Sequence, residues 1–234
     1  MLNRPVRRLA LTCAAVTVLA APAPAAAQQT LNVSVGLFTP RGEDARVRGD
    51  VLTANRTFLL FDVGEFKGPS VGGEWLLPIG NYLEGGAGLS FTRRTVPSIY
   101  EDFVDNDGSE IEQDLRLRIV PVAFTVRVVP TGHNAAVQPY VGAGLGVFNW
   151  RYSESGEFID FGAGREIFRD QYVASGNRTG AVALGGIRFV GSAVTSGFEV
   201  RYHKAEADLD DRFAGSQIDL GGWTYNFTLG IRFR

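Results

Sequence analysis

The sequence predicts an all-β fold: an eight-stranded antiparallel up-and-down transmembrane barrel with short periplasmic turns and long extracellular loops. Three observations support this prediction. Apolar residues recur at every second position in eight segments, the period of a strand with one apolar and one polar face. Long and short connections alternate between these segments. The chain also begins with the pattern of an export signal.

The first 27 residues have the three parts of a secretory signal peptide. Arg4, Arg7 and Arg8 form a basic start, an apolar stretch spans 9–19, and alanines at 25–27 give a small-residue cleavage pattern. The apolar stretch is too short for a membrane-spanning helix, which needs ~20 apolar residues. We therefore expect residues 1–27 to direct export through the Sec pathway and residues 28–234 to form one barrel domain.

Composition narrows the classes of function. The chain has 23 basic and 25 acidic residues, and the expected signal peptide contains three of the basic residues and no acidic one. The remaining domain is therefore net negative, which argues against a nucleic-acid partner. The single cysteine, Cys13, lies in the signal peptide, so the domain has no disulfide, thiolate ligand or cysteine nucleophile.

The expected strands follow one another along the domain. Their alternating segments are 31–37, 71–79, 83–92, 115–128, 141–147, 181–189, 198–203 and 223–233. The short connections lie near 80–82, 130–136 and 191–195, and the long ones near 39–69, 95–113, 153–175 and 206–217. Barrels of bacterial outer membranes have this asymmetry, with short turns in the periplasm and longer loops outside.

Two features depart from simple alternation. Residues 57–66 are strand-like, but a ninth strand would put the 95–113 loop on the wrong side of the membrane. We therefore assign them to the first outer loop, as a strand extension or a short helix. Pro121 interrupts the fourth strand and removes a ladder hydrogen bond, so we expect a bulge or a distortion there.

The last strand and two glycine-rich segments carry a resemblance to a known family. The last strand presents a predicted lipid-facing row of Trp223, Tyr225, Phe227, Leu229, Ile231 and Phe233. With the stretches 83–89 and 139–146, it resembles the small outer-membrane β-barrels of Gram-negative bacteria, the outer membrane protein A membrane domain and the outer membrane protein X type. The resemblance implies a monomer in the outer membrane, in contact with membrane lipid, lipopolysaccharide and the barrel assembly machinery. Arg234 departs from the terminal aromatic residue that this machinery usually reads.

We expect a network of charges inside the barrel. An eight-stranded barrel is just wide enough to be filled by side chains. A basic side chain facing lipid at the membrane midplane costs ~2–4 kcal/mol. The charged residues placed inside are Glu84, Arg94, Arg116, Arg118, Arg188, Glu199, Arg201, His203 and Arg232. The expected role is a salt-bridge network that plugs the barrel, and a gated path for small ions is the alternative.

Few residues are suited to catalysis. His133 lies in a predicted periplasmic turn, where we expect it to be solvated. His203 could pair with Asp208, Asp210 or Asp211, as acid–histidine pairs do in barrel proteases. No nucleophile motif accompanies either histidine, so we expect no catalytic residues, no cofactor and no enzyme.

The expected outer loops are rich in acidic residues. Asp105, Asp107 and Glu110 are the candidate ligands for a divalent cation, because hard cations prefer carboxylate oxygens. The spacing of a calcium loop is absent, so we predict no metal site.

These features predict a non-enzymatic outer-membrane barrel with a structural or surface-interaction role through its extracellular loops, where a surface ligand would bind. One alternative is a narrow channel for small hydrophobic molecules or ions. Another is a lipid-modifying or proteolytic barrel enzyme. Whether the lumen is closed or open along its axis distinguishes the first two.

Overall fold

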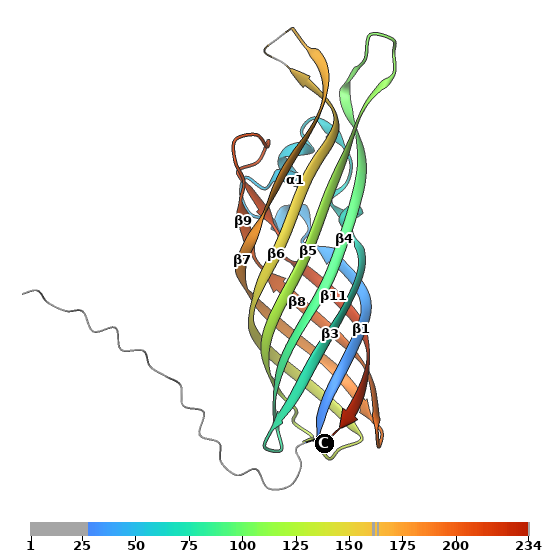
Figure 1. Cartoon of the computed structure of the whole chain (residues 1–234), viewed down its shortest axis with the longest axis vertical. Coiled ribbons are helices and arrows are strands. Elements are labelled where there is room, and N and C mark those ends of the chain that lie inside the picture. Colours follow the sequence, from blue (N-terminus) through green and yellow to red (C-terminus); the bar gives the residue numbers. More distant parts are fainter. Residues whose placement is uncertain (1–27, 161, 163, 234) are drawn as a thin grey trace, which may run out of the picture.

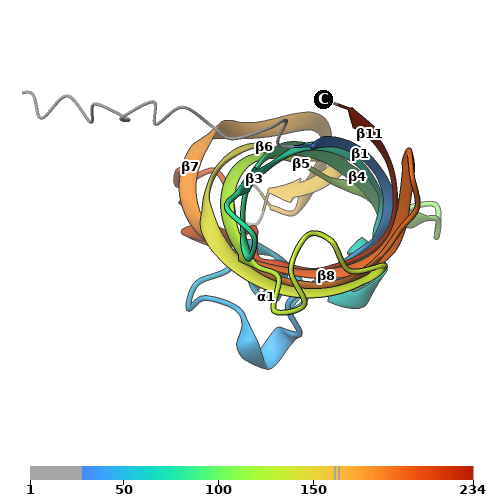
Figure 2. The ribbon, with the colours of Figure 1, turned by 90° about the horizontal axis from the view of Figure 1, so that it is seen from below.

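The computed structural model describes residues 28–160, 162 and 164–233, so the expected signal peptide 1–27 lies outside the described residues. Within the described chain, eight strands form a closed antiparallel ring (Figures 1 and 2). They are β1 (Gln29–Pro40), β3 (Gly68–Ile79), β4 (Leu83–Val104), β5 (Glu110–Val128), β6 (Val137–Asp160), β7 (Glu166–Val190), β8 (Val194–Lys204) and β11 (Gly222–Phe233).

The first and last strands close the barrel. β1 pairs with β11 over its whole length, from Gln29 opposite Phe233 to Pro40 opposite Gly222. Every other barrel strand pairs with the strand before it and the strand after it in this order. Closure leaves no unpaired edge, so the backbone groups of the ring are hydrogen-bonded without water. The predicted fold class and strand order are confirmed.

Short connections lie at the end of the barrel that holds the carboxyl terminus (Figure 1). They join β3 to β4, β5 to β6 and β7 to β8. At the opposite end, the hairpins β4–β5 and β6–β7 extend far beyond the other four strands of the barrel (Figure 1). Both connections are short, because β5 begins at Glu110 after β4 ends at Val104, and β7 begins at Glu166 after β6 ends at Asp160. Most of the residues expected in two long loops, 95–113 and 153–175, therefore belong to strands.

The segment between β1 and β3 folds over the long end of the barrel. It contains η1 (Glu43–Ala45), α1 (Val51–Asn55), β2 (Leu59–Leu60) and η2 (Val63–Phe66). The carboxylate of Asp50 caps α1 by accepting hydrogen bonds from the backbone of its first turn. Residues 57–66 thus include both a strand that pairs with β4 and a short helix. No helix in the described chain is long and apolar enough to cross a membrane.

A small hairpin between β8 and β11 completes this end. It pairs β9 (Glu206–Asp208) with β10 (Gln217–Asp219). The Asp50 carboxylate accepts a hydrogen bond from the Asp219 backbone at 2.7 Å and pairs with Arg46, whose Nε lies 2.6 Å from Asp50 Oδ1. The first loop and the last hairpin are therefore joined by buried polar contacts.

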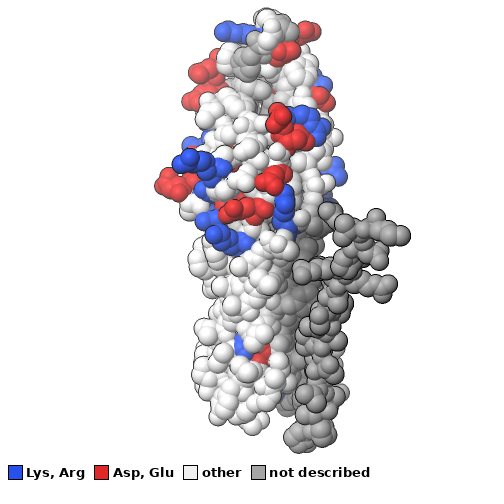
Figure 3. All heavy atoms as spheres, turned by 90° about the vertical axis from the view of Figure 1, so that its left-hand side faces the viewer, with Lys and Arg blue, Asp and Glu red and all other residues white. Residues whose placement is uncertain are grey.

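The half of the barrel nearest the carboxyl terminus presents an apolar outer wall. On β11, the six alternating residues from Trp223 to Phe233 are exposed by 41–64%. Leu145 on β6 and Phe124 on β5 are exposed by 71% and 66%. Figure 3 shows that charged residues are scarce on the lower half of one face and gather on the upper half. This apolar belt is the surface that a barrel presents to a lipid bilayer.

The apolar side of each long strand changes at the top of this belt. On β5, Val122, Phe124, Val126 and Val128 point outward. Above them, Leu115, Leu117 and Ile119 point inward and are 0–5% exposed. Ladder pairing with β6 continues through the change without a register shift. The surroundings therefore change along a single strand, from lipid to water, while its side chains keep one alternation.

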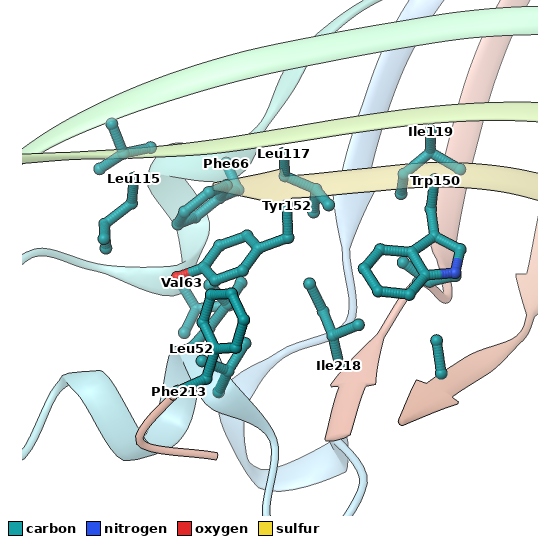
Figure 4. Packing of buried hydrophobic residues seen from close by; sticks show 14 of the residues in the cluster. Leu52, Val63, Phe66, Leu115, Leu117, Ile119, Trp150, Tyr152, Phe213 and Ile218 are labelled. Atoms are coloured by element: carbon teal, nitrogen blue, oxygen red, sulfur yellow. The ribbon is translucent and has the colours of Figure 1, made fainter. Parts of the chain in front are cut away.

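The upper half encloses a core like that of a soluble protein (Figure 4). Aromatic residues Phe148, Trp150 and Tyr152 point inward from β6 and are at most 3% exposed. Residues of the first loop and the last hairpin cover them, including Leu52, Val63, Phe66, Phe213 and Ile218. This extracellular core fills the barrel and closes its upper mouth.

The distortion expected at Pro121 is a gap in pairing rather than a bulge. Pairing between β4 and β5 stops after Leu89 opposite Val122 and resumes at Thr92 opposite Ile119, in the same register. On the other side, Pro121 remains opposite Phe148. The missing amide hydrogen removes a bond without inserting a residue. The register shift in this ladder lies farther up, between Ile99 and Val104.

Two leucines on opposite sides of the wall give a matched test of this core. Leu115→Ala removes a side chain from the extracellular core and should destabilise the protein by ~2–5 kcal/mol. Leu145→Ala removes the same atoms from the lipid-facing wall and should cost clearly less in detergent, because no cavity forms. Denaturant unfolding of both variants in the same micelles measures the difference. Equal losses would contradict the assignment of the two faces.

Candidate functional site

The lumen at the level of the apolar belt holds six ionised side chains. This set, called the lumenal ion cluster, comprises Glu74, Glu84, Arg127, Arg188, Glu199 and Arg201. The members come from five strands, β3, β4, β5, β7 and β8. Three carboxylates and three guanidinium groups have no net charge together, which is a requirement for burying ions.

Arg127 lies at the centre of the cluster with a side chain only 1% exposed. It pairs with Glu74, and its Nη2 lies 3.0 Å from Glu199 Oε2. Its Nη1 is 3.9 Å from Glu84. Arg201 Nη2 joins the same two carboxylates, at 3.1 Å from Glu74 and 2.7 Å from Glu199. Each carboxylate therefore contacts a cation.

A second branch runs toward the periplasmic turns. Arg188 Nη2 lies 2.8 Å from Glu84 Oε2 and donates a bond of the same length to Gln138 Oε1. The Gln138 amide donates to the backbone carbonyls of His133 and Ala135. The lumenal ion cluster is thereby connected to the turn between β5 and β6, which helps to hold that turn beneath the barrel.

Tyr140 on β6 lies between the two branches. Its hydroxyl donates to Glu199 Oε2 at 3.2 Å, and its ring centre is 4.9 Å from Arg127 Cζ and 5.9 Å from Arg188 Cζ. Gly186 leaves room for this ring, because a Cβ there would lie 2.7 Å from the Tyr140 hydroxyl. The glycine therefore permits the close approach of the Tyr140 ring to the neighbouring strand β7.

The lumen is closed above the ion cluster. The rings of His203 and Phe148 meet edge to face with centroids 5.4 Å apart, and Trp150 lies one inward position farther along β6. The cavity between Glu74, Arg201 and the polar residues of β1 and β11 has a volume of about 20 Å³. That is room for about one water molecule.

The structure divides the predicted lumenal residues. Glu84, Arg188, Glu199, Arg201 and His203 lie together in the lumen. The placement of Arg116 and Arg118 inside was wrong: they lie on the outer wall, because Leu115, Leu117 and Ile119 occupy the inner face of β5.

The remaining two predicted residues lie at opposite ends of the barrel. Arg94 is exposed, and its Nε donates to the carbonyl of Glu65 in the first loop at 3.0 Å. Arg232 is half-buried, and its Nη1 donates to the carbonyl of Gly191 in a periplasmic turn at 3.1 Å. Neither reaches the ion cluster by a contact that the structure describes.

Sequence reasoning missed two central residues, Glu74 and Arg127. Both stand between apolar residues that the alternation places outside: Glu74 between Gly73 and Trp75, and Arg127 between Val126 and Val128. Their signal was therefore present in the sequence. On β5 this signal is obscured, because Arg116 and Arg118 occupy the opposite phase and form the predicted inward set.

The histidines have no catalytic arrangement in the described chain. His203 is 4% exposed in the lumen, whereas Asp208 and Asp210 pair with arginines on the surface. The structure does not bring His203 together with these acids. His133 is less solvated than expected, because its turn folds toward the lumen and its Nε2 lies 3.8 Å from Glu84 Oε2.

The candidate metal ligands lie at a hairpin tip. The carboxylates of Asp105 and Asp107 accept hydrogen bonds from the backbone amides of Asn106 and Ser109. They organise the turn, in which Gly108 has a φ of +85°. Among the described residues, no group of three or more His, Asp or Glu side chains is placed to hold a metal ion.

A hollow of about 200 Å³ opens beside the extracellular core. Asn55, Tyr100, Glu154 and Tyr172 are among its lining residues. Asn55 and Tyr152 each donate a hydrogen bond to Glu154 Oε1, at 2.6 and 2.8 Å. Burial raises the pKa of the Glu154 carboxyl above its usual value of 4.5, although both hydrogen bonds oppose the shift.

Comparison with known proteins gives no family model and no curated protein that matches. Solved structures similar to this chain include the following three. The attachment invasion locus protein Ail of Yersinia pestis, solved with the heparin analogue sucrose octasulfate, is 11% identical with a TM-score of 0.47, covering 89% of this chain and 100% of that chain. Neisserial surface protein A is 13% identical with a TM-score of 0.47, covering 90% and 100%.

The third is the N-terminal β-barrel domain of Pseudomonas aeruginosa OprF, 13% identical with a TM-score of 0.38, covering 88% of this chain and 97% of that chain. All three are small eight-stranded outer-membrane β-barrels, the group that the sequence resembles. At these identities the likeness concerns the fold alone. The closed strand ladder and the apolar belt establish the barrel independently.

Arg127 gives a direct test of the lumenal ion cluster. Arg127→Met leaves two buried glutamates short of a cation and should destabilise the barrel by ~3–5 kcal/mol. Arg116→Met, on the outer wall, should change stability by less than ~1 kcal/mol. Urea unfolding in lipid vesicles, followed by heat-modifiable gel migration, measures both. Adding Glu74→Gln to Arg127→Met leaves two carboxylates and two guanidinium groups, with Arg201 still paired to Glu199, and should restore part of the loss. A loss for Arg116→Met as large as that for Arg127→Met would contradict the placement.

Glu154 should make the extracellular core sensitive to pH. Its folded pKa is raised, so its contribution to stability is fully present below pH 4.5 and is lost as the pH rises through the folded pKa. Glu154→Gln keeps the acceptor oxygen but not the titration. Thermal unfolding between pH 4.5 and 8 should show wild type losing stability relative to Glu154→Gln as pH rises. Parallel curves would contradict the buried titration.

Proposed function

We propose that this protein is a non-enzymatic outer-membrane barrel with a structural or surface-interaction role through its extracellular part, and that its lumen does not conduct. The observation that carries the proposal is the filled lumen. The ion cluster occupies the membrane-spanning half, and the aromatic core occupies the half above it. Two successive layers of buried side chains leave no room for a hydrated ion to pass.

The extensions of β4, β5, β6 and β7 support a role at the cell surface. They stand beyond the apolar belt, and Arg165 at one hairpin tip lies over the ring of Phe103 on the other, at 5.4 Å. On their outer wall, a hollow of about 530 Å³ is lined by Glu112, Asp114, Glu157 and Arg169, among others. A long, braced and acidic surface of this kind is suited to contact with a soluble or cell-surface partner.

A channel and a barrel enzyme are less well supported. A channel needs a continuous path, whereas Arg127 and Phe148 are 1% and 0% exposed along the axis. A hydrolase or protease needs a histidine in contact with its nucleophile or acid. His203 instead packs against Phe148.

Planar bilayer recordings test the closed lumen. Purified protein inserted into bilayers should give negligible conductance at neutral pH and moderate voltage, because no aqueous path crosses the two buried layers. A known porin inserted in the same way provides the positive control. Discrete current steps from the wild-type protein would overturn the proposal.

Epitope tags on intact cells test the outer-membrane placement separately. A tag inserted between Asp107 and Gly108 should bind antibody on intact cells, because this tip lies at the extracellular end. A tag inserted between Asn134 and Ala135, in a periplasmic turn, should bind only after permeabilisation. Fractionation of the protein into the periplasmic extract would refute the placement.

A further inference from the structure

Three arginines form a row across the outer wall. Arg93 on β4 lies directly opposite Arg118 on β5, and Arg118 lies directly opposite Arg151 on β6. Their neighbours along each strand, such as Thr92, Leu117 and Trp150, point inward and are buried. Arg116, the next outward residue on β5, adds a fourth guanidinium beside the row. Like charges directly opposite each other on adjacent strands are destabilising.

No carboxylate of the described chain forms an ion pair with any of these four arginines. Arg118 Nη2 donates to the neutral Asn149 side chain at 3.0 Å, and Arg116 Nε donates to the Thr95 hydroxyl at 3.0 Å. Arg118 Nε is buried without a partner. Arginines elsewhere on the extracellular part, such as Arg169 with Glu157, do have acidic partners. The row therefore has an excess of positive charge and an unused donor.

The row lines a hollow in the wall. This arginine hollow has a volume of about 260 Å³ and is lined by Arg93, Arg116, Arg118, Arg151, Ser153 and Gln171. Guanidinium groups converging on one space are suited to bind phosphate oxygens in pairs. Asp114 lies two residues beyond Arg116 on the same face and is not among the lining residues.

The position of the hollow indicates what kind of molecule brings the phosphate. The residues one outward position below the row are Phe91, Val120 and Asn149, and those one position farther are the apolar Leu89, Val122 and Val147. The arginine hollow thus lies at the upper edge of the apolar belt. A membrane amphiphile has the same order, with an acyl part beside the belt and a phosphate at its edge.

We propose that the arginine hollow binds the phosphate of a phosphorylated glycolipid in the outer leaflet of the membrane. This inference rests on the proposed outer-membrane placement, because that placement puts the row on the extracellular side. The lipid phosphate supplies the negative charge that the protein itself lacks at Arg93, Arg118 and Arg151. The acyl chains lie along Leu89, Val122 and Val147.

The test uses purified full-length domain in a neutral detergent and bisphosphorylated lipid A as the probe. Native mass spectrometry measures how much lipid A remains bound to wild type and to Arg93→Gln/Arg118→Gln/Arg151→Gln. The triple variant should retain at least about tenfold less lipid, because three charge-assisted contacts are lost. The matched control Arg48→Gln/Arg169→Gln/Arg178→Gln removes the same charge elsewhere and should retain lipid as wild type does.

The stability of the protein to denaturant gives an independent readout. Loss of an arginine should lower lipid retention but raise stability when no lipid is present. Without anionic lipid, Arg118→Gln should raise the denaturation midpoint in detergent, because it relieves repulsion within the row. With lipid A present, wild type should gain more stability than Arg118→Gln. Unchanged lipid retention in the triple variant, or a destabilised Arg118→Gln in the absence of lipid, would overturn the proposal.

Competing probes distinguish the sources of phosphate. Dephosphorylated lipid A should bind poorly, and inorganic phosphate or soluble heparin should not displace the lipid at matched charge concentration. Displacement by inorganic phosphate would indicate a site for free anions. Displacement by heparin would indicate a site for a soluble polyanion. Either result would overturn the assignment of the ligand as a lipid. The epitope tags could be exposed on intact cells as expected while the purified protein retains no lipid A. That combination would refute this inference and leave the outer-membrane placement intact.

Discussion

The whole structure depends on one constraint: each long strand crosses two surroundings while its side chains alternate with a fixed period of two. In the lower half the outside of the ring is hydrocarbon, so apolar residues such as Phe124 point outward. In the upper half the outside is water, so apolar residues such as Leu115 point inward. Because the ladder stays in register, only the choice of residues changes at the boundary.

This constraint explains the two different interiors. In the membrane-spanning half, the apolar residues lie on the outer wall, where lipid covers them. The narrow lumen is filled by acidic and basic side chains that form ion pairs. In the upper half, hydrophobic burial is available only inside, so Phe148, Trp150 and Tyr152 fill the ring. A one-residue slip of any strand would place ions in lipid and aromatic residues in water.

The boundary between the two halves is also where charge meets the membrane. Arg93 and Arg118 stand on the outer wall one outward position above Phe91 and Val120, and Arg151 lies opposite Arg118 on β6. Their inward neighbours along the strands, such as Thr92, Leu117 and Trp150, carry no carboxylate. The apolar residues change from the outer to the inner face of the strands at this level. This change builds the extracellular core and leaves cations without acidic partners on the outer wall.

Much of the barrel could be predicted from local sequence. Alternation gave the eight strands and their order, and the uneven connections gave the two ends. The assignment of Arg116 and Arg118 to the lumen failed because one phase was extended along the whole of the fourth strand. Adjacent apolar residues at Ile119–Val120 and at Val147–Phe148 mark where the apolar side changes, and they are visible in the sequence.

The sequence by itself determined the strand period, the closed membrane barrel and the face of each terminal-strand residue, because these follow from local alternation. Only the tertiary structure decided that the polar stretches 95–104 and 153–160 are strands, since their inward residues need partners from the first loop and the last hairpin. It also decided which charges meet in the lumen. Glu74, Arg127 and Glu199 are far apart along the chain, and only ring closure brings them within contact distance.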